Sequence, residues 1–123
     1  MCYYIRMEKE FKLKDVSIIA KKILDLAKNS KKNKATIITL SGELGAGKTR
    51  LTQEIGKLLS ISERIISPTF VIMKIYKIKS SCKYYPLYKR LVHIDAYRLN
   101  SSDELNILGW EEIISDVNNL IIL

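Results

Sequence analysis

Apolar residues recur at helical spacing in two stretches of the chain, and each stretch predicts a helix. The first covers residues 15–30, where Asp15 can cap the start and the lysines face water. Its apolar face comprises Val16, Ile19, Ile23 and Leu26. The second follows directly after a glycine-rich loop. Its apolar positions are Leu51, Ile55, Leu58 and Leu59.

Shorter apolar runs predict strands. Residues 35–40 and 118–123 are apolar without alternation, which is typical of strands buried in a parallel sheet. Because Pro68 cannot donate to a strand ladder, we expect a loop at residues 67–69 and a strand from there to about Ile78. A polar turn or hairpin tip follows at residues 79–90, and then a further strand over residues 91–97.

The segment between the last two predicted strands has the pattern of a short helix and its turn. Ser101 and Glu104 have capping-box spacing, and Gly109 suits the C-terminal turn of that helix. Trp110, with Ile113 and Ile114, is most simply an anchor in the core. Helices and short buried strands in this order predict an α/β fold.

The glycine-rich loop fits the pattern G-x-x-x-x-G-K-[ST] from Gly42 to Thr49. Glycines let successive backbone N–H groups point at phosphate oxygens, and the following helix adds the positive end of its dipole. Lys48 would reach the β and γ phosphates, and the Thr49 hydroxyl would ligate Mg²⁺. The strand before and the helix after are the context that this motif requires, which disfavours a plain glycine-rich turn.

The motif therefore predicts a stretch that binds the phosphates of a nucleotide such as ATP or ADP, together with Mg²⁺. It comprises Glu43, Leu44, Gly45, Ala46, Gly47, Lys48, Thr49 and Arg50. Within it, the Glu43 carboxylate is expected to face solvent rather than phosphate.

Polar residues elsewhere supply candidates for the metal and the γ-phosphate. Asp95 ends an apolar run and is the expected metal carboxylate, the alternative being an aspartate that caps a turn. His93 lies on the same face of that strand, and on its own it reads more simply as a structural histidine. Thr69 could reach the γ-phosphate from its loop, or belong to a Ser-Pro-Thr turn. Arg98 could pair with phosphate, with a carboxylate or with a partner protein.

Length and composition describe one folded domain. The chain has 123 residues, of which 47% are hydrophobic and 28% charged. Because no apolar run approaches the roughly 20 residues that cross a bilayer and no signal peptide is recognisable, we expect no membrane association and cytoplasmic residence. Cys2 and Cys82 are too few for a disulfide framework or zinc site. Met7 is a candidate start, which would make residues 1–6 a non-native or flexible extension of a domain covering residues 7–123.

The formal net charge of +8 is compatible with a polyanionic partner. Lysine far outnumbers arginine, and the excess could also reflect a compositional bias. Residues 74–90 alternate lysines and tyrosines in a way that could stack on and neutralise RNA. A solvated edge hairpin protected by lysines explains the same residues equally well. Nothing in the pattern indicates DNA as a partner.

Four motifs together resemble the TsaE (YjeE) family of bacterial ATPases. They are LGAGKT at residues 44–49, SPTF at 67–70, HIDAYRL at 93–99 and ELNILGWEE at 104–112. They occur in the family's order, and the resemblance runs from about Met7 to Leu123. It implies a P-loop NTPase-like α/β domain of three layers, with a central mixed sheet flanked by helices.

The resemblance also implies an activity, partners and site residues. It implies an ATPase that needs Mg²⁺ and hydrolyses ATP when assembled with TsaD and TsaB, which install the threonylcarbamoyl group on adenosine 37 of tRNA. ATP hydrolysis would drive turnover of that complex, and tRNA contact would be indirect or through a basic surface. Lys48, Thr69 and Asp95 would be catalytic, with Thr49 and Asp95 at the metal. Further matches to the family's signature are Gly42, His93, Tyr97, Arg98, Glu104, Gly109 and Glu112.

One departure from the family lies at the C-terminus. Family members continue past the strand that matches residues 118–123 with a Glu-Trp pair, whose acidic residue is implicated in catalysis, and a further segment. The present sequence ends at Leu123. We therefore expect a truncated or split gene product in which nucleotide binding survives better than hydrolysis.

Other functions stay open beside the ATPase. One is a nucleotide-gated binding module without catalysis that docks on TsaD or tRNA, and another is a small-molecule kinase. A kinase needs an acceptor pocket and usually an arginine-bearing lid, for which no segment is long enough. A GTPase is disfavoured, since Asn33 and Lys34 lack the aspartate of the base-reading motif and precede the phosphate loop.

Overall fold

The computed structural model describes residues 3–5, 13–29, 33–40, 47–66, 72–95 and 101–123. These residues form a five-stranded sheet in the order β1-β2-β5-β4-β3. The strands are β1 (Tyr3–Ile5), β2 (Thr36–Ile38), β3 (Met73–Lys77), β4 (Arg90–Ile94) and β5 (Asn119–Ile122). β2 is parallel to both of its neighbours, β1 and β5, and β5 is also parallel to β4. β3 pairs antiparallel with β4 at the edge, so the sheet is mixed.

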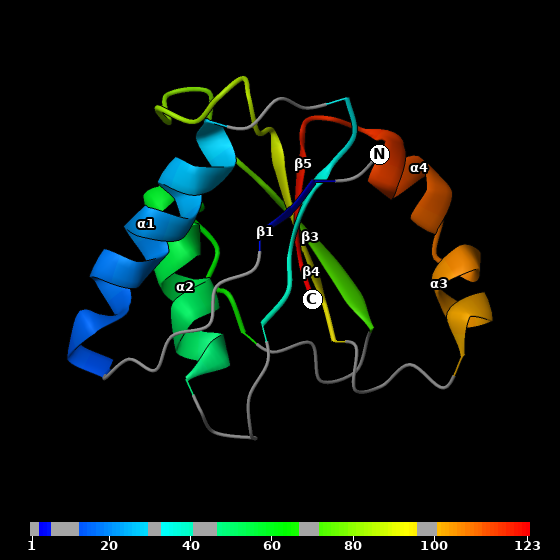
Figure 1. The fold of residues 1–123 in the computed structure, drawn as a ribbon, viewed down its shortest axis with the longest axis horizontal. Helices are drawn as coiled ribbons and strands as arrows, with labels where there is room; N and C mark the ends of the chain where they lie inside the picture. Colours follow the sequence, from blue (N-terminus) through cyan, green and yellow to red (C-terminus); the bar gives the residue numbers. More distant parts are fainter. Residues whose placement is uncertain (1–2, 6–12, 30–32, 41–46, 67–71, 96–100) are drawn as a thin grey trace.

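Helices cover both faces of this sheet (Figure 1). On one face lie α1 (Val16–Lys28), which follows the 3-10 turn η1 (Leu13–Asp15), and α2 (Lys48–Leu58). On the other lie the short helices α3 (Ser102–Ile107) and α4 (Trp110–Ser115). The predicted three-layer α/β fold with a mixed central sheet is thereby confirmed. Among the described residues, no helix has the length and hydropathy needed to span a bilayer.

Alternation along the strands divides the core into two clusters. Leu91 of β4 and Ile38 of β2 pack with α1 and α2, whereas Val92 of β4 and Ile37 of β2 pack toward α3 and α4. All four side chains are at most 2% exposed. The strands β2, β4 and β5 are therefore buried on both faces, as predicted for residues 35–40 and 118–123.

The first helix differs from its prediction in two details. Leu26 is 47% exposed, because the buried face passes through Ala20, Leu24 and Ala27 instead. Asp15 does occupy the N-cap position, but within the described part of the chain its side chain makes no capping hydrogen bond. Its backbone closes the 3-10 turn rather than adopting the extended conformation that directs a capping side chain at the helix.

Other differences concern the ends of the chain and the helical segment after residue 100. The sequence pattern predicted no strand at Tyr3–Ile5, whereas the structure pairs β1 with β2. Ser101 precedes α3 as predicted, although its side chain makes no capping bond among the described residues. Gly109 has the left-handed φ of 83° that suits a helix C-terminus, and the chain then forms the additional helix α4.

Candidate phosphate-binding site

The phosphate-loop motif joins a buried strand to an amphipathic helix. β2 is buried along its whole length, and its ladder with β5 continues to Leu40, whose N–H donates to the Leu123 carbonyl at 3.0 Å. Gly47 has a φ of 88°, which favours glycine, and α2 begins at the next residue, Lys48. The first N–H groups of such a helix have no partner inside it, so they are donors for an anion.

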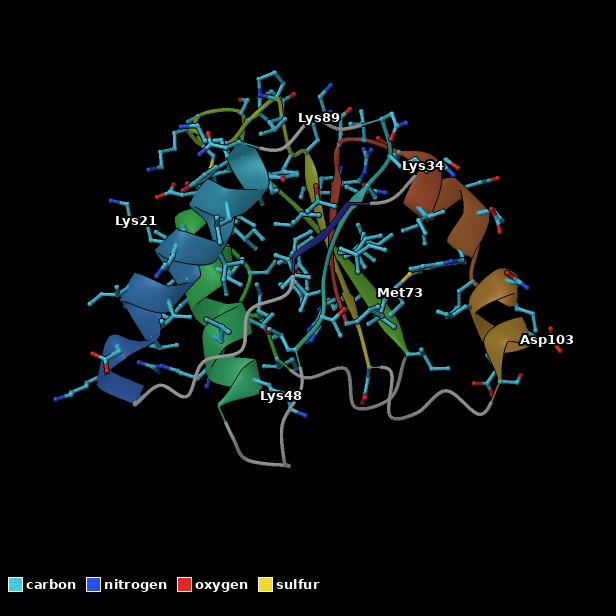
Figure 2. The ribbon with its side chains drawn as sticks, viewed as in Figure 1. Lys21, Lys34, Lys48, Met73, Lys89 and Asp103 are labelled. Carbon is cyan, nitrogen blue, oxygen red and sulfur yellow. The ribbon has the colours of Figure 1, made fainter. Side chains whose placement is uncertain are left out.

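The carboxyl ends of the parallel strands meet at this same edge of the sheet. Ile38 of β2 and His93 of β4 are both in register with Ile122 of β5, which lies between them. Asp95 follows β4 directly, and its N–H donates to the Ile72 carbonyl at 2.8 Å. Figure 2 shows Lys48 at the start of α2 on this edge. The strand order therefore brings Lys48, Thr49 and Asp95 to one edge of the sheet.

The pleat of β4 places His93 on the α2 face. Leu91 contacts the α1 and α2 core, whereas Val92 and Ile94 contact the opposite one. His93 alternates with them and so shares the face of Leu91. Asp95 follows the strand two residues after His93, and its N–H bonds to the Ile72 carbonyl. Asp95 therefore lies at the carboxyl end of β4, at the edge of the sheet where α2 begins.

His93 is a buried polar side chain next to this carboxylate. It is 9% exposed, and among the described residues its Nδ1 has no hydrogen-bond partner. Burial lowers the pKa of His93 below its ordinary value, and the neighbouring charge of Asp95 acts in the opposite direction. The environment therefore favours the neutral imidazole. A fully satisfied structural histidine, the simpler interpretation from sequence, is not what the described residues show.

Two further candidates lie within the described residues. Arg50 is in the first turn of α2, and its Nη2 lies 3.9 Å from Oε1 of Glu54. Glu112 lies on α4, which covers the face of the sheet opposite α2, so the fold does not bring it to Lys48 or Thr49. The remaining predicted site residues lie outside the described residues. These are Gly42, Glu43, Leu44, Gly45, Ala46, Thr69, Tyr97 and Arg98.

The sequence analysis did not identify Glu54, which connects α2 to α1. It lies on the buried side of α2, 8% exposed, and accepts hydrogen bonds from Ser17 of α1 and from Lys57. A signal was present, since Glu54 directly precedes Ile55 and follows Leu51 by three residues on the apolar side of the helix. The contact to Ser17 joins α1 to α2.

The donors present suit a hydrated Mg²⁺ ion held together with phosphate. In the part of the chain that the structure describes, no three His, Cys, Asp or Glu side chains gather to hold a metal by themselves. Mg²⁺ is ordinarily bound through one or two protein oxygens, substrate phosphates and water. Thr49 and Asp95, which the strand order brings to one edge of the sheet, carry a hydroxyl and a carboxylate that fit that requirement.

Comparison with known proteins assigns the chain to a family. The sequence profile described as Threonylcarbamoyl adenosine biosynthesis protein TsaE matches residues 12–123. The chain belongs to the TsaE family. This confirms the resemblance inferred from the four motifs, and the fold of the TsaE family is P-loop NTPase-like.

Individual TsaE relatives are similar over most of the chain. The relative from Nostoc sp. is 43% identical over 81 residues, covering 63% of this chain and 45% of the relative. The relative from Rickettsia typhi is 40% identical over 98 residues, covering 79% of this chain and 60% of the relative. Both are named tRNA threonylcarbamoyladenosine biosynthesis protein TsaE. The chain thus spans about half the length of the curated relatives it matches.

Proposed function

We propose that the chain binds ATP with Mg²⁺ at the carboxyl edge of its sheet and hydrolyses it. One observation carries the proposal: α2 begins at Lys48, after the left-handed Gly47, at the same edge of the sheet as Asp95. A helix N-terminus alone would bind many anions. The lysine, the hydroxyl and the carboxylate together are the set that phosphoryl transfer from a nucleotide requires.

Each residue has a distinct part in this proposal. The Lys48 ammonium would neutralise the β and γ phosphates, while N–H groups from residues 43–49 and the first turn of α2 donate to phosphate oxygens. Thr49 and Asp95 would hold Mg²⁺, which would neutralise charge on the phosphates. Thr69, Tyr97 and Arg98 stay predicted contacts on the γ-phosphate side. His93, buried and neutral beside Asp95, would fix the position of that carboxylate.

The family name and the names of the relatives support a place in tRNA modification. We propose that the ATPase acts in the cytoplasm with TsaD and TsaB, the partners that the motif resemblance implies. ATP hydrolysis would drive turnover of that complex, whereas transfer of the threonylcarbamoyl group would belong to the partners. The nucleotide-gated binding module remains the second candidate within the same family.

Separate measurements of ATP binding and of turnover test the proposal. Lys48→Ala is compared with Lys21→Ala, which removes an exposed lysine from the outer side of α1 (Figure 2). Lys48→Ala is expected to weaken ATP binding in calorimetry about 10- to 100-fold, because hydrogen bonds to charged groups contribute about 1.5–3 kcal/mol. Lys21→Ala is expected to bind ATP as the unchanged chain does.

Asp95→Asn tests the metal ligand separately. It is expected to retain ATP binding without Mg²⁺ and to lose the gain in affinity that Mg²⁺ provides, together with turnover in the presence of TsaD and TsaB. Equal ATP affinity in Lys48→Ala and the unchanged chain would refute the phosphate site. ATP binding without any turnover beside TsaD and TsaB would leave the binding module as the function.

A further inference from the structure

The lysines and tyrosines of residues 74–90 separate in the folded protein. Tyr76, Tyr84 and Tyr88 are at most 2% exposed and belong to the α1 and α2 core. The lysines are exposed or half-buried, and three of them lie over tyrosine rings: the distances from Nζ to the ring centroid are 5.2 Å for Lys74 and Tyr76, 5.1 Å for Lys83 and Tyr84, and 5.7 Å for Lys89 and Tyr85. The buried rings therefore cannot stack on bases, whereas the ammonium groups remain available to a ligand.

Apart from Lys74, these lysines lie at the end of the sheet opposite Lys48, the first residue of α2. Lys34 shortly precedes β2 and Lys89 directly precedes β4, whereas Lys79 follows the antiparallel β3. Figure 2 shows Lys34 and Lys89 at one end of the molecule and Lys48 at the other. The last turn of α1 reaches the same end, because the Tyr84 hydroxyl donates to Asp25 at 3.4 Å. We call this surface the basic end; it comprises Lys28, Lys34, Lys79, Lys83 and Lys89.

The nearby carboxylates do not form ion pairs with the lysines of the basic end. Asp116 is paired with Arg90, and Asp25 accepts the hydroxyl of Tyr84. Within the described part of the chain, no carboxylate lies within ion-pairing distance of the five lysines. Residues 73–90 contain no Asp or Glu at all. Five positive charges thus share one end of a small domain, where their potentials add.

The chemistry of this surface indicates a phosphate backbone rather than a protein. Protein interfaces have an apolar, often aromatic centre. Among residues 77–90, every Leu, Ile, Cys and Tyr side chain is buried or partly buried, so only polar residues, lysines and Pro86 are exposed. Contacts to nucleic-acid phosphates come from such lysines and carry no sequence information.

We propose that the basic end binds the phosphate backbone of RNA, without reading its sequence, while the opposite edge binds nucleotide. The choice of RNA among polyanions rests on the proposed function in tRNA modification. The two sites lie at opposite ends of the strands, so the chain can contact RNA and hold ATP at the same time. Because every aromatic side chain of residues 77–90 is buried or partly buried, the contact is expected to be electrostatic and strongly dependent on salt.

Two double variants with equal charge changes test the proposal on the full chain. Lys79→Glu with Lys83→Glu alters the basic end, and Lys21→Glu with Lys22→Glu alters exposed lysines on the outer side of α1. Binding to a fluorescent tRNA transcript is measured by anisotropy over a series of salt concentrations, and ATP binding by calorimetry. The first variant is expected to lose about 30-fold in RNA affinity near 0.1 M salt, with the slope against log salt reduced by about 0.7–0.9 for each contact removed.

The control variant is expected to lose much less affinity, and both variants are expected to bind ATP normally. Equal losses in the two variants would overturn the proposal, since binding would then follow net charge alone. Competition by polyglutamate as strong as that by RNA, at equal charge, would also overturn it in favour of an acidic protein partner. Because ATP binding is measured on the same samples, failure of the RNA contact is distinguishable from failure of the proposed ATPase.

Discussion

Glu54 shows how one residue supports the candidate site without belonging to it. Its Oε1 accepts a hydrogen bond from Lys57 Nζ at 3.0 Å, and its Oε2 accepts one from Ser17 Oγ at 3.1 Å. The bond from Lys57 is the largest cause that lowers the pKa of Glu54 below 4.5; burial acts against it, and the bond from Ser17 lowers it further. The charged form of Glu54 is thus favoured in the folded protein.

A pH series tests this stabilisation. Since the folded-state pKa of Glu54 is lowered, its contribution to the free energy of unfolding is complete above the unfolded-state value of 4.5 and is lost as the pH falls below it. Urea denaturation between about pH 6 and pH 3 should therefore show a smaller loss of stability in Glu54→Gln than in the unchanged chain.

The matched control for Glu54 is Glu63→Gln. The Glu63 carboxylate lies 3.7 Å from Lys74 Nζ, but its side chain is 59% exposed. An exposed ion pair contributes about 0–1 kcal/mol, so this variant should follow the pH dependence of the unchanged chain. Parallel curves for the unchanged chain and Glu54→Gln would contradict the prediction.

At the scale of elements, α2 is held against the segment that follows it. Gln53 Nε2 donates to the Ile65 carbonyl at 2.9 Å, and the Ile65 side chain, 3% exposed, packs on Gly56. A Cβ on Gly56 would lie 2.2 Å from Cδ1 of Ile65. The glycine in the last turn of α2 therefore allows Ile65 to approach the helix that carries Lys48.

Gly56→Ala is expected to destabilise the protein although alanine favours helices. The gain in helix propensity is about 1 kcal/mol, whereas forcing a buried side chain to move costs about 1–3 kcal/mol. In an Ile65→Val background, which lacks Cδ1, the same substitution should become neutral or stabilising. A double-mutant cycle from urea denaturation measures the coupling. Additive effects of the two substitutions would refute the contact.

Gly109→Ala offers a contrast between steric contact and backbone strain. Gly109 joins α3 to α4 with a φ of 83°, and nothing lies within 4 Å of an added Cβ. Only the left-handed backbone is then unfavourable, at about 1–2 kcal/mol. Thermal denaturation should show that loss for Gly109→Ala and a smaller one for Gly109→Asn, because asparagine tolerates this conformation better. Equal stability of all three proteins would contradict the argument.

At the scale of the whole molecule, the parallel strands separate two surfaces. Their carboxyl ends lie at the edge where α2 begins at Lys48, and their amino ends lie at the basic end (Figures 1 and 2). A ligand that binds only the folded chain stabilises all of it, by about 2.7 kcal/mol at a hundredfold excess over its Kd. ATP with Mg²⁺ should therefore raise the melting temperature of the whole domain.

The increase in melting temperature should disappear in Lys48→Ala and persist in the Lys79→Glu, Lys83→Glu variant. Differential scanning calorimetry with and without ATP and Mg²⁺ measures it. Because Lys79 and Lys83 lie at the end opposite α2's first turn, their replacement leaves the proposed phosphate contacts in place. Loss of the increase in both variants would mean that the two ends are not independent.

Local patterns in the sequence were sufficient for most of the fold. The apolar runs of residues 35–40, 91–97 and 118–123 predicted β2, β4 and β5, and helical spacing predicted α1 and α2. β1 was missed because three residues carry too little periodicity to distinguish a strand from a loop. Leu26 was placed on the wrong face, because alanines that spacing arguments overlook carry part of the buried face of α1.

By itself the sequence determined the phosphate-loop motif, the family and most of the elements, because each motif and each element depends on residues close together along the chain. Only the tertiary structure decided which side chains meet. The strand order places β5 between β2 and β4, and the pleat of β4 directs His93 toward the α2 face. Packing of the hairpin on α1 buries Tyr84 and leaves Lys79 and Lys83 exposed. Which side chains are buried, and which face they lie on, depends on contacts between segments that are distant in the sequence. No local pattern in the sequence contains these contacts.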